Sequence, residues 1–250
     1  MEIRIFDDQR ALVKAAADRA VEVIRQAIAE RGQARVVAST GESQVELLRD
    51  LSAHREVDWP KVEVFSIGEF IGLPADHPAS MQRFLQGRLV AKTGAKQITL
   101  LTTEADRARK MVEVGSKLQS VPADIAFVGI GDNAHLGLNV PPADFDSHEP
   151  YLTMDLDLAY RTQQVNEGWF VEVGQVPMRA ISMSIQQLLK AKEILALASG
   201  SSKALAVKVC VEHGISPTAP ASILRAHLNA AMYLDRDSSA QLTVKELSQP

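Results

Sequence analysis

The feature that most constrains this fold is a regular alternation of short apolar runs and longer amphipathic segments along the chain. The run ARVVAST (34–40) is rich in β-branched residues, Gly41 follows it, and SQVELLRDLSAH then has apolar residues at helical spacing. A strand, a glycine turn and a helix form the first half of a βαβ unit. Strands that are joined by helices run parallel and carry helices on both faces. The pattern therefore predicts a doubly wound, mostly parallel α/β sheet.

The same alternation predicts the remaining elements of one domain that spans residues 1–250. A first helix is expected over 11–28, because apolar residues recur at helical spacing there and Gly32 stops the run. Further strands are expected at 62–67, 97–101, 124–130, 152–156, 179–184, 193–199 and 230–235. Further helices are expected at 80–91, 104–118, 185–191, 202–214 and 222–225. The Pro-rich stretches near Pro141 and Pro217 are expected to be loops within this domain.

Composition excludes several classes of function. The formal net charge is −4 and the Lys and Arg residues are scattered, so we expect no nucleic-acid partner. No uninterrupted apolar run reaches the roughly 18 residues that span a bilayer, and the first residues lack the pattern of a secretory leader. Cys210 is the only cysteine, which is typical of a reducing compartment. A cytoplasmic protein without a membrane partner is the expectation.

Two loops are suited to bind an anion at the start of a helix. Thr40, Gly41, Glu42 and Ser43 lie between a predicted strand and a predicted helix, where free N–H groups and the helix dipole favour phosphate. Lys203 lies in the first turn of a later helix, where its charge opposes the dipole unless an anion is present. An ordinary capped turn and a solvated lysine are the structural alternatives for these two loops.

The segment GIGDNAH (129–135) follows a predicted strand and matches the spacing of a dinucleotide-binding loop. Such a loop opens a helix, whereas the glycine and two prolines of LGLNVPP do not permit one here. His135 is instead the histidine best placed for chemistry. Glu69 at another strand end is either a general base or a carboxylate that caps a turn or holds a lysine. No pair of histidines has metal-ligand spacing with a third ligand nearby, so no metal is expected.

Five segments in order resemble one known family. They are STGES, FSIGEFIGLPADHPAS, GIGDNAHLGLNVP, QVPMRAISMS and SGSSKALAV. They are similar to the motifs of the glucosamine-6-phosphate deaminase/isomerase family, which is related in fold to the 6-phosphogluconolactonases. The resemblance covers nearly the whole chain and implies a Rossmann-like sheet and no metal or organic cofactor. Homo-oligomers are common among such relatives, and nothing in this sequence sets the number of subunits.

The resemblance also implies a reaction and residues for it. An aminosugar 6-phosphate opens its ring with help from the motif histidine, a carboxylate moves a proton between C1 and C2, and ammonia leaves to give fructose 6-phosphate. His135 takes the ring-opening role, and Lys203 with the Thr40–Ser43 loop holds phosphate. Arg161 is assigned as the phosphate-binding arginine, although counting back from QVP places Glu167 where one branch has Arg.

Three departures from the family pattern bear on this reaction. Gly68 stands where the family has the proton-transfer Asp, and Val140 stands where it has Glu or Asp. Asn133 stands directly before Ala134 and His135, as in part of the family, where other members have Asp. Loss of a general base usually costs about 10²–10⁴ in rate. We expect His135 to lack the carboxylate that fixes its tautomer, unless Asp132, Asp144 or Asp146 replaces it.

The function hypotheses follow from what is kept and what is missing. The first is an enzyme of aminosugar-phosphate isomerisation or deamination, and the second is a weakened enzyme that binds or senses a sugar phosphate. The third is a lactonase of the related family. The segment FIGLPADHP fits the deaminase pattern better than the lactonase pattern. The fourth is that none of these loops binds a ligand, which two anion-ready helix starts beside a histidine loop make improbable.

Overall fold

In the computed structural model, described for residues 1–100 and 105–243, seven strands form one parallel sheet. In chain order they are β1 (Glu2–Phe6), β2 (Ala34–Ala38), β3 (Val62–Ser66), β5 (Lys96–Ile98), β6 (Ile125–Gly129), β9 (Ile194–Ala198) and β10 (Ala230–Asp235). Their order across the sheet is β1-β10-β9-β6-β2-β3-β5, with every neighbouring pair parallel. The prediction of a doubly wound α/β sheet is confirmed.

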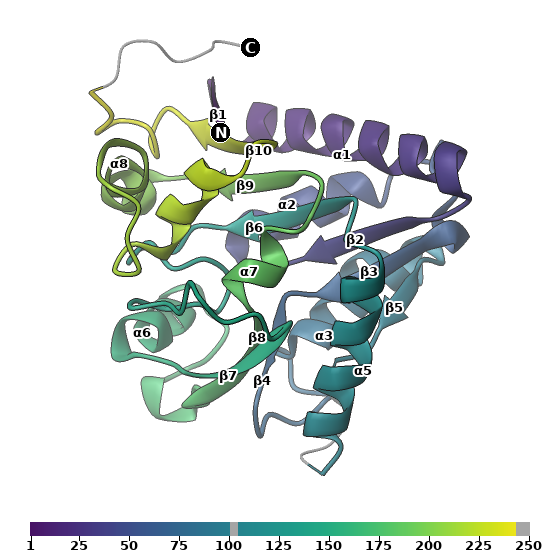
Figure 1. The fold of residues 1–250 in the computed structure, drawn as a ribbon. Coiled ribbons are helices and arrows are strands. Elements are labelled where there is room, and N and C mark those ends of the chain that lie inside the picture. The colour runs from purple at the N-terminus through teal and green to yellow at the C-terminus, as the bar shows by residue number, and fades with distance from the viewer. Residues whose placement is uncertain (101–104, 244–250) are drawn as a thin grey trace.

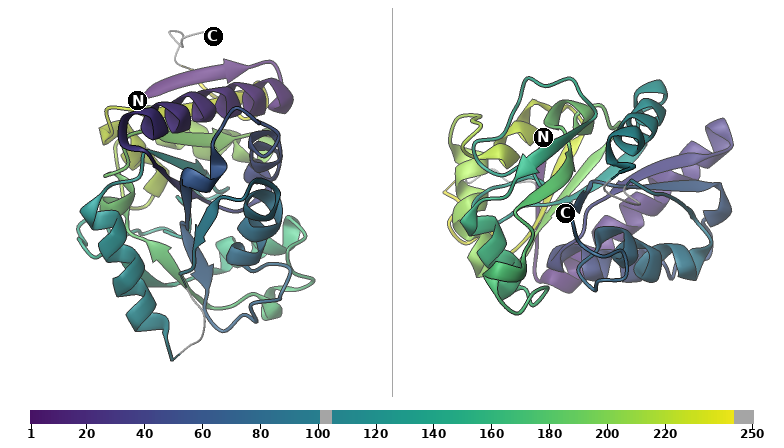
Figure 2. Two further views of the ribbon diagram at one scale, coloured as in Figure 1. Left: turned by 90° about the vertical axis from the view of Figure 1, so that its right-hand side faces the viewer. Right: turned by 90° about the horizontal axis from the view of Figure 1, so that it is seen from below.

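Helices cover both faces of this sheet (Figures 1 and 2). One face carries α1 (Gln9–Arg31) and α2 (Glu42–Leu51), and the other carries α5 (Arg107–Ser120) and α8 (Ala204–Glu212). Within β6, Ile125 and Phe127 pack towards α1 and α2, whereas Ala126 and Val128 pack towards the opposite face. Because successive side chains point to opposite faces, a strand buried on both sides needs an unbroken apolar run. This is why IAFV is apolar throughout.

A second, smaller sheet is the part of the fold that the sequence did not predict. It consists of β4 (Gly68–Phe70), β8 (Arg179–Met183) and β7 (Tyr151–Asp155), paired antiparallel in the order β4-β8-β7. With α6 (Leu158–Asn166) it forms the lower group of elements in Figure 1. The predicted strand over 62–67 corresponds to β3, which ends at Ser66 in the large sheet, whereas β4, which begins at Gly68 in the small sheet, was not predicted.

Other boundaries also differ from the sequence pattern. The helix expected over 80–91 consists of α3 (Met81–Leu85), a π-helical turn (Gln86–Val90) and α4 (Ala91–Thr93). The helix expected from Ile185 is a single turn, α7 (Ile185–Leu188), and the edge strand β1 has no counterpart in the prediction. Leu101 and Glu104, at the ends of two expected elements, lie outside the described residues.

Short 3₁₀ turns complete the described elements. They cover Trp59–Lys61, Val173–Gln175, Ser201–Lys203 and Pro220–Ala226. The turn at Ser201–Lys203 leads directly into α8, so the helix expected over 202–214 begins with a tighter turn that carries Lys203.

Gly68 is the residue that lets the small sheet approach the histidine loop. A Cβ atom at this position would lie 2.2 Å from the backbone oxygen of Ile181 and 2.3 Å from Cδ1 of Leu138. These distances are far below van der Waals contact, and the nearest atom belongs to the backbone. The space that a side chain at position 68 would need is therefore occupied by β8 and by Leu138.

We expect Gly68→Ala to lower the free energy of unfolding by about 1–3 kcal/mol, because the added methyl group overpacks the contact between β4 and β8. Urea unfolding of the purified protein measures the change. Gly87→Ala is the matched control, since a Cβ there meets nothing within 4 Å. It should leave stability unchanged or raise it slightly. Equal stability of Gly68→Ala and the wild type would contradict the crowded geometry.

Candidate active site

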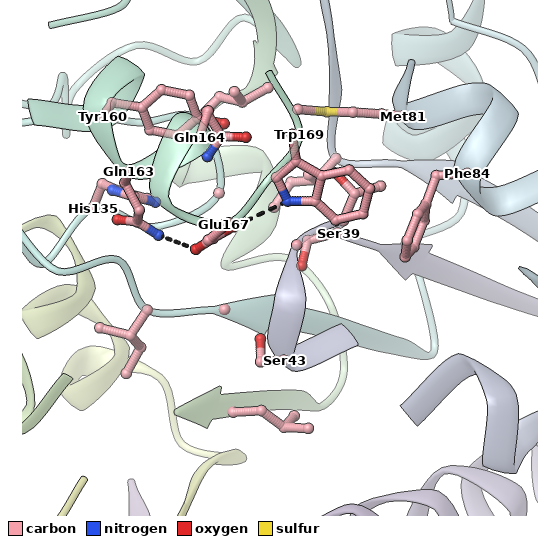
Figure 3. A pocket seen from close by; sticks show the side chains of 18 of the residues that line it. Ser39, Ser43, Met81, Phe84, His135, Tyr160, Gln163, Gln164, Glu167 and Trp169 are labelled. Carbon is pink, nitrogen blue, oxygen red and sulfur yellow. Dashed lines mark hydrogen bonds between the residues drawn. The ribbon is translucent and has the colours of Figure 1, made fainter. Parts of the chain in front are cut away.

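A cavity lies where the loops after β2, β6 and β9 meet at the carboxyl edge of the sheet. This edge is where open parallel sheets bind ligands. The cavity has a polar wall formed by Ser39, Thr40, Gly41, Ser43, His135, Gln163, Gln164, Glu167, Ser199 and Lys203. Its apolar wall is formed by Ile67, Phe70, Met81, Phe84, Leu138, Tyr160 and Trp169. Figure 3 shows several of these side chains converging from separate elements.

The loop after β2 supplies the start of a helix to this cavity. Gly41 precedes α2 with a φ of +128°, and no side chain caps the first turn of the helix. Its first N–H groups are therefore open to a ligand. The hydroxyl of Ser39 lies in the same wall, is buried and has no hydrogen-bond partner among the described residues. The side chain of Glu42, another predicted phosphate contact, lies outside the described part of the chain.

His135 is held in one orientation by its own loop. Its Nδ1 lies 2.7 Å from Oδ1 of Asn133, and Nδ2 of that Asn donates to Asp157 at 3.3 Å. Because the amide oxygen only accepts, Nδ1 carries the proton and Nε2 keeps a lone pair. Among the described residues, the group that fixes the tautomer is therefore the amide of Asn133 in place of a carboxylate, and the carboxylate of Asp157 accepts from that amide. Gly131 permits the packing, because a Cβ there would lie 1.9 Å from the imidazole.

Burial keeps the imidazole of His135 uncharged at neutral pH. The side chain is 6% exposed and lies edge-on to the ring of Tyr160, with 4.8 Å between the ring centroids. The pKa of His135 is lowered to about 3, mainly by desolvation and also by the charge of Lys203, while Asp132 opposes this effect. Burial also raises the pKa of the Tyr160 phenol, so that hydroxyl stays protonated. The site therefore presents a neutral histidine beside a neutral tyrosine.

Lys203 reaches the cavity from the turn before α8. Its Nζ lies 2.6 Å from Oδ1 of Asp132 and 3.8 Å from Oε1 of Glu167. The turn is fixed from behind, because the carboxylate of Asp235 accepts the N–H of Gly200. The sequence predicts that a bound anion would stabilise a lysine in this turn. In the structure, the carboxylates of Asp132 and Glu167 already lie near the ammonium group of Lys203.

Glu167 is the cavity residue whose position the sequence did not reveal. It ends α6, its side chain is 11% exposed, and it accepts hydrogen bonds from Nε2 of Gln163 at 2.6 Å and Nε1 of Trp169 at 3.1 Å. The dashed lines in Figure 3 mark both bonds. The run QQVNEGW contains a signal that could have found it. Gly168 predicts the end of a helix, and Glu167 just before it follows two glutamines that face the core. Alignment with the family could only place it opposite an arginine.

Glu69 has a structural role in this geometry. Its side chain is 3% exposed, and its two oxygens accept the N–H groups of Phe70, Met81 and Gln82 and the hydroxyl of Ser80. The carboxylate thus caps the helical segment that begins at Met81. It is not among the described residues that line the cavity. Of the two predicted alternatives, the turn-capping role fits the geometry and the general base does not.

Arg161 also lies away from the described cavity wall. It is on α6, and its Nη2 donates to the carbonyl of Val173 at 2.7 Å. The guanidinium therefore tethers the loop after α6 to that helix. The assignment of Arg161 as a phosphate ligand is not supported by this position.

The positions of the two missing carboxylates are filled by apolar packing. Val140 and Leu138 belong to one buried cluster with Phe70, Leu156 and Tyr160, and Gly68 lies against Leu138. The other predicted replacements do not reach this place. Asp144 caps an exposed turn, Asp146 is exposed, and Asp132 pairs with Lys203.

We expect acid to destabilise this protein through His135. The folded protein resists protonation down to about pH 3, whereas the unfolded chain takes the proton near its ordinary pKa of 6.5. The free energy of unfolding therefore falls as the pH decreases between these values, by about 2 kcal/mol at pH 5. Urea unfolding at pH 7.5 and 5 should show this loss in the wild type and a smaller loss in His135→Gln. The exposed-residue variant His148→Gln should behave as the wild type, and an identical pH dependence in all three would contradict this account.

We expect Glu69→Gln to lower the free energy of unfolding by about 1–3 kcal/mol, because its amide NH₂ cannot accept from the helix N–H groups. Glu149→Gln changes an exposed side chain and should stay within about 0.5 kcal/mol of the wild type. Thermal and urea unfolding measure both. Full stability combined with lost activity in Glu69→Gln would instead restore the general-base role.

Two features are absent from the described residues. No three His, Cys, Asp or Glu side chains in residues 1–100 and 105–243 are grouped so that they could hold a metal ion. Over the same residues, no helix has the length and apolar character to cross a membrane.

Known sequences resemble this chain over most of its length. Residues 7–233 match the family model for glucosamine-6-phosphate isomerases/6-phosphogluconolactonase. A glucosamine-6-phosphate deaminase of Listeria innocua is 31% identical over 229 residues, covering 91% of this chain and 96% of that protein. A glucosamine-6-phosphate deaminase of Streptococcus gordonii is 31% identical over 224 residues, covering 89% and 93%.

Solved structures agree with these sequences. A monomeric glucosamine-6-phosphate deaminase matches with a TM-score of 0.88 and 26% identity, covering 97% of this chain and 100% of that one. A 6-phosphogluconolactonase from Shewanella baltica matches with a TM-score of 0.76 and 18% identity, covering 94% and 97%, which shows a shared fold. The resemblance drawn from the five sequence segments is confirmed: this chain belongs to the glucosamine-6-phosphate isomerase/6-phosphogluconolactonase family.

Proposed function

We propose that this protein binds an aminosugar 6-phosphate and opens its ring, as an isomerase or deaminase of glucosamine 6-phosphate type. The observation that carries the proposal is the oriented, neutral His135 in the same cavity as an uncapped helix start and Lys203. A neutral imidazole with a free Nε2 accepts the proton of the C1 hydroxyl and returns a proton to the ring oxygen. Asn133 positions His135 for this step.

The phosphate is proposed to bind at the start of α2. The free N–H groups after Gly41, together with the hydroxyls of Ser39 and Ser43, offer donors to an anion. Lys203 adds a positive charge when the phosphate replaces Asp132 as its partner. The side chain of Asp132 is 41% exposed, so it can turn towards solvent. Breaking the Lys203–Asp132 ion pair costs little, because a surface ion pair contributes about 0–1 kcal/mol. The loop and lysine assignments remain proposals that rest on this arrangement.

The apolar wall suits the carbon face of a sugar. Trp169 and Phe84 meet edge to face, with 5.6 Å between their ring centroids, and Met81 and Phe70 lie in the same wall. Ligand sites commonly combine such apolar area with a few polar groups that fix orientation. The proposed pose lays the sugar against this wall with its polar edge towards His135.

A second candidate is a protein that binds the sugar phosphate but turns it over slowly. Gly68 and Val140, which stand where the family has carboxylates and pack with Leu138, favour it, because neither residue can move a proton. Ammonia release from glucosamine 6-phosphate, measured with the purified wild type, distinguishes the two candidates. A cytoplasmic location and one domain over 1–250 are further expectations of this proposal.

We expect Lys203→Ala to weaken binding of glucosamine 6-phosphate by about 10- to 100-fold, because a hydrogen bond to a charged group contributes about 1.5–3 kcal/mol. Isothermal calorimetry measures the dissociation constants. Lys208→Ala on the same helix is the matched control, since Lys208 pairs with Glu212 outside the cavity. Its affinity should equal that of the wild type. Absence of binding heat for glucosamine 6-phosphate and glucose 6-phosphate would refute the proposed function.

A further inference from the structure

We propose that Gln164 selects the configuration of the bound sugar, because its side-chain amide binds the neighbouring hydroxyls at C3 and C4. The inference rests on the proposed function and goes further, since it names the residue that decides which hexose 6-phosphate the cavity accepts. The observation that carries it is a buried amide in the cavity wall with neither polar atom bonded to another described residue.

The amide of Gln164 is not used to hold the protein together. The residue lines the cavity, and it is 8% exposed. Its backbone oxygen accepts from the N–H of Trp169, but its side chain makes no hydrogen bond with any of the described residues. Buried amides in folded proteins are normally hydrogen-bonded, because an unpaired one is costly. This amide is therefore available to a ligand in the cavity.

The preceding glutamine shows what a structural role is at this place. Oε1 of Gln163 accepts the backbone N–H of Asp132 at 3.0 Å, and its Nε2 donates to Oε1 of Glu167 at 2.6 Å. Both polar atoms of that amide thus join the histidine loop to the end of α6. Gln163 and Gln164 are equally buried, so the direction of the side chain alone separates the bonded amide from the free one.

The place of Gln164 on α6 lies between the two ends of the proposed ligand. Tyr160, Gln164 and Glu167 are on one face of the helix, since residues three and four apart are neighbours. Figure 3 shows Gln164 beside Tyr160 on this face. The ring centroid of Tyr160 lies 4.8 Å from that of His135, and Glu167 lies 3.8 Å from Nζ of Lys203. A sugar with C1 at His135 and its phosphate at Lys203 therefore passes Gln164 with the middle of its ring.

The chemistry of an amide matches two hydroxyls on neighbouring carbons. A glutamine side chain has donor hydrogens on Nε2 and an acceptor in Oε1, and each hydroxyl can donate or accept. Nε2 donates to one of the C3 and C4 hydroxyls, and Oε1 accepts from the other. Inversion at C4 moves one hydroxyl to the other face of the ring, so that one bond is lost while the phosphate and C1 keep their places. Sites built to hydrogen-bond a hydroxyl reject analogues that do not present it.

The test compares Gln164→Met with the wild type, because methionine keeps the length of glutamine and removes both polar atoms. Calorimetry measures the affinity for glucosamine 6-phosphate, its C4 epimer galactosamine 6-phosphate and its C2 epimer mannosamine 6-phosphate. We expect the wild type to prefer the glucosamine over the galactosamine form by about 5- to 100-fold, the range for one or two neutral hydrogen bonds. Gln164→Met should lose most of this preference. The ratio of affinities for glucosamine and mannosamine 6-phosphate should stay at its wild-type value.

Urea unfolding without ligand separates recognition of the sugar from a structural role. Gln164→Met replaces an unpaired buried amide with an apolar side chain, so its urea midpoint should equal or exceed that of the wild type. Gln163→Met removes an amide with two protein partners and should unfold at a lower urea concentration. Gln175→Met changes an exposed side chain outside the cavity and should keep the wild-type affinities and midpoint.

The outcomes distinguish this inference from the proposed function. A wild-type preference between the C4 epimers in Gln164→Met overturns the inference, and so does a wild type that does not distinguish them. A lower urea midpoint with an equal loss of affinity for all three sugars also overturns it, because Gln164 is then structural. In each of these cases, binding by the wild type leaves the proposed function standing. Absence of wild-type binding to all three sugars refutes the proposed function and the inference with it.

Discussion

Parallel pairing of β2, β6 and β9 is the constraint on which the rest of the molecule depends. Because these neighbouring strands run in one direction, the loops that leave them emerge at one edge of the sheet. Residues 39–43, 129–135 and 199–203 are far apart in the sequence and meet there. Glycines at 41, 131 and 200 permit the tight backbone that each loop needs, two of them with positive φ.

The positive charge at this site is already paired with carboxylates, whereas a simple anion pocket would leave it free for the ligand. Lys203 lies between the carboxylates of Asp132 and Glu167, while His135 is kept neutral by burial. Of these two carboxylates, Asp132 is the more exposed. Glu167 stays in the cavity wall, held by Gln163 and Trp169.

The loss of one acidic side chain is coupled to packing on the opposite strand. Gly68 lets β4 pair closely with β8, and Leu138 fills the space where a side chain at position 68 would lie. Reversal of the glycine alone would therefore produce a clash and not a restored site.

The sequence by itself determined the large parallel sheet and the loops at its carboxyl edge. Hydrophobic periodicity, glycine positions and five motifs predicted the strands, the placement of His135 and Lys203 near strand ends, and the family. Only the tertiary structure decided which carboxylates face the cavity. Glu69 and Glu167 both look available in the sequence, yet one caps a buried helix and the other enters the cavity. The small antiparallel sheet and the Asn133–Asp157 contact were likewise hidden, because they join segments whose distance in space no local pattern records.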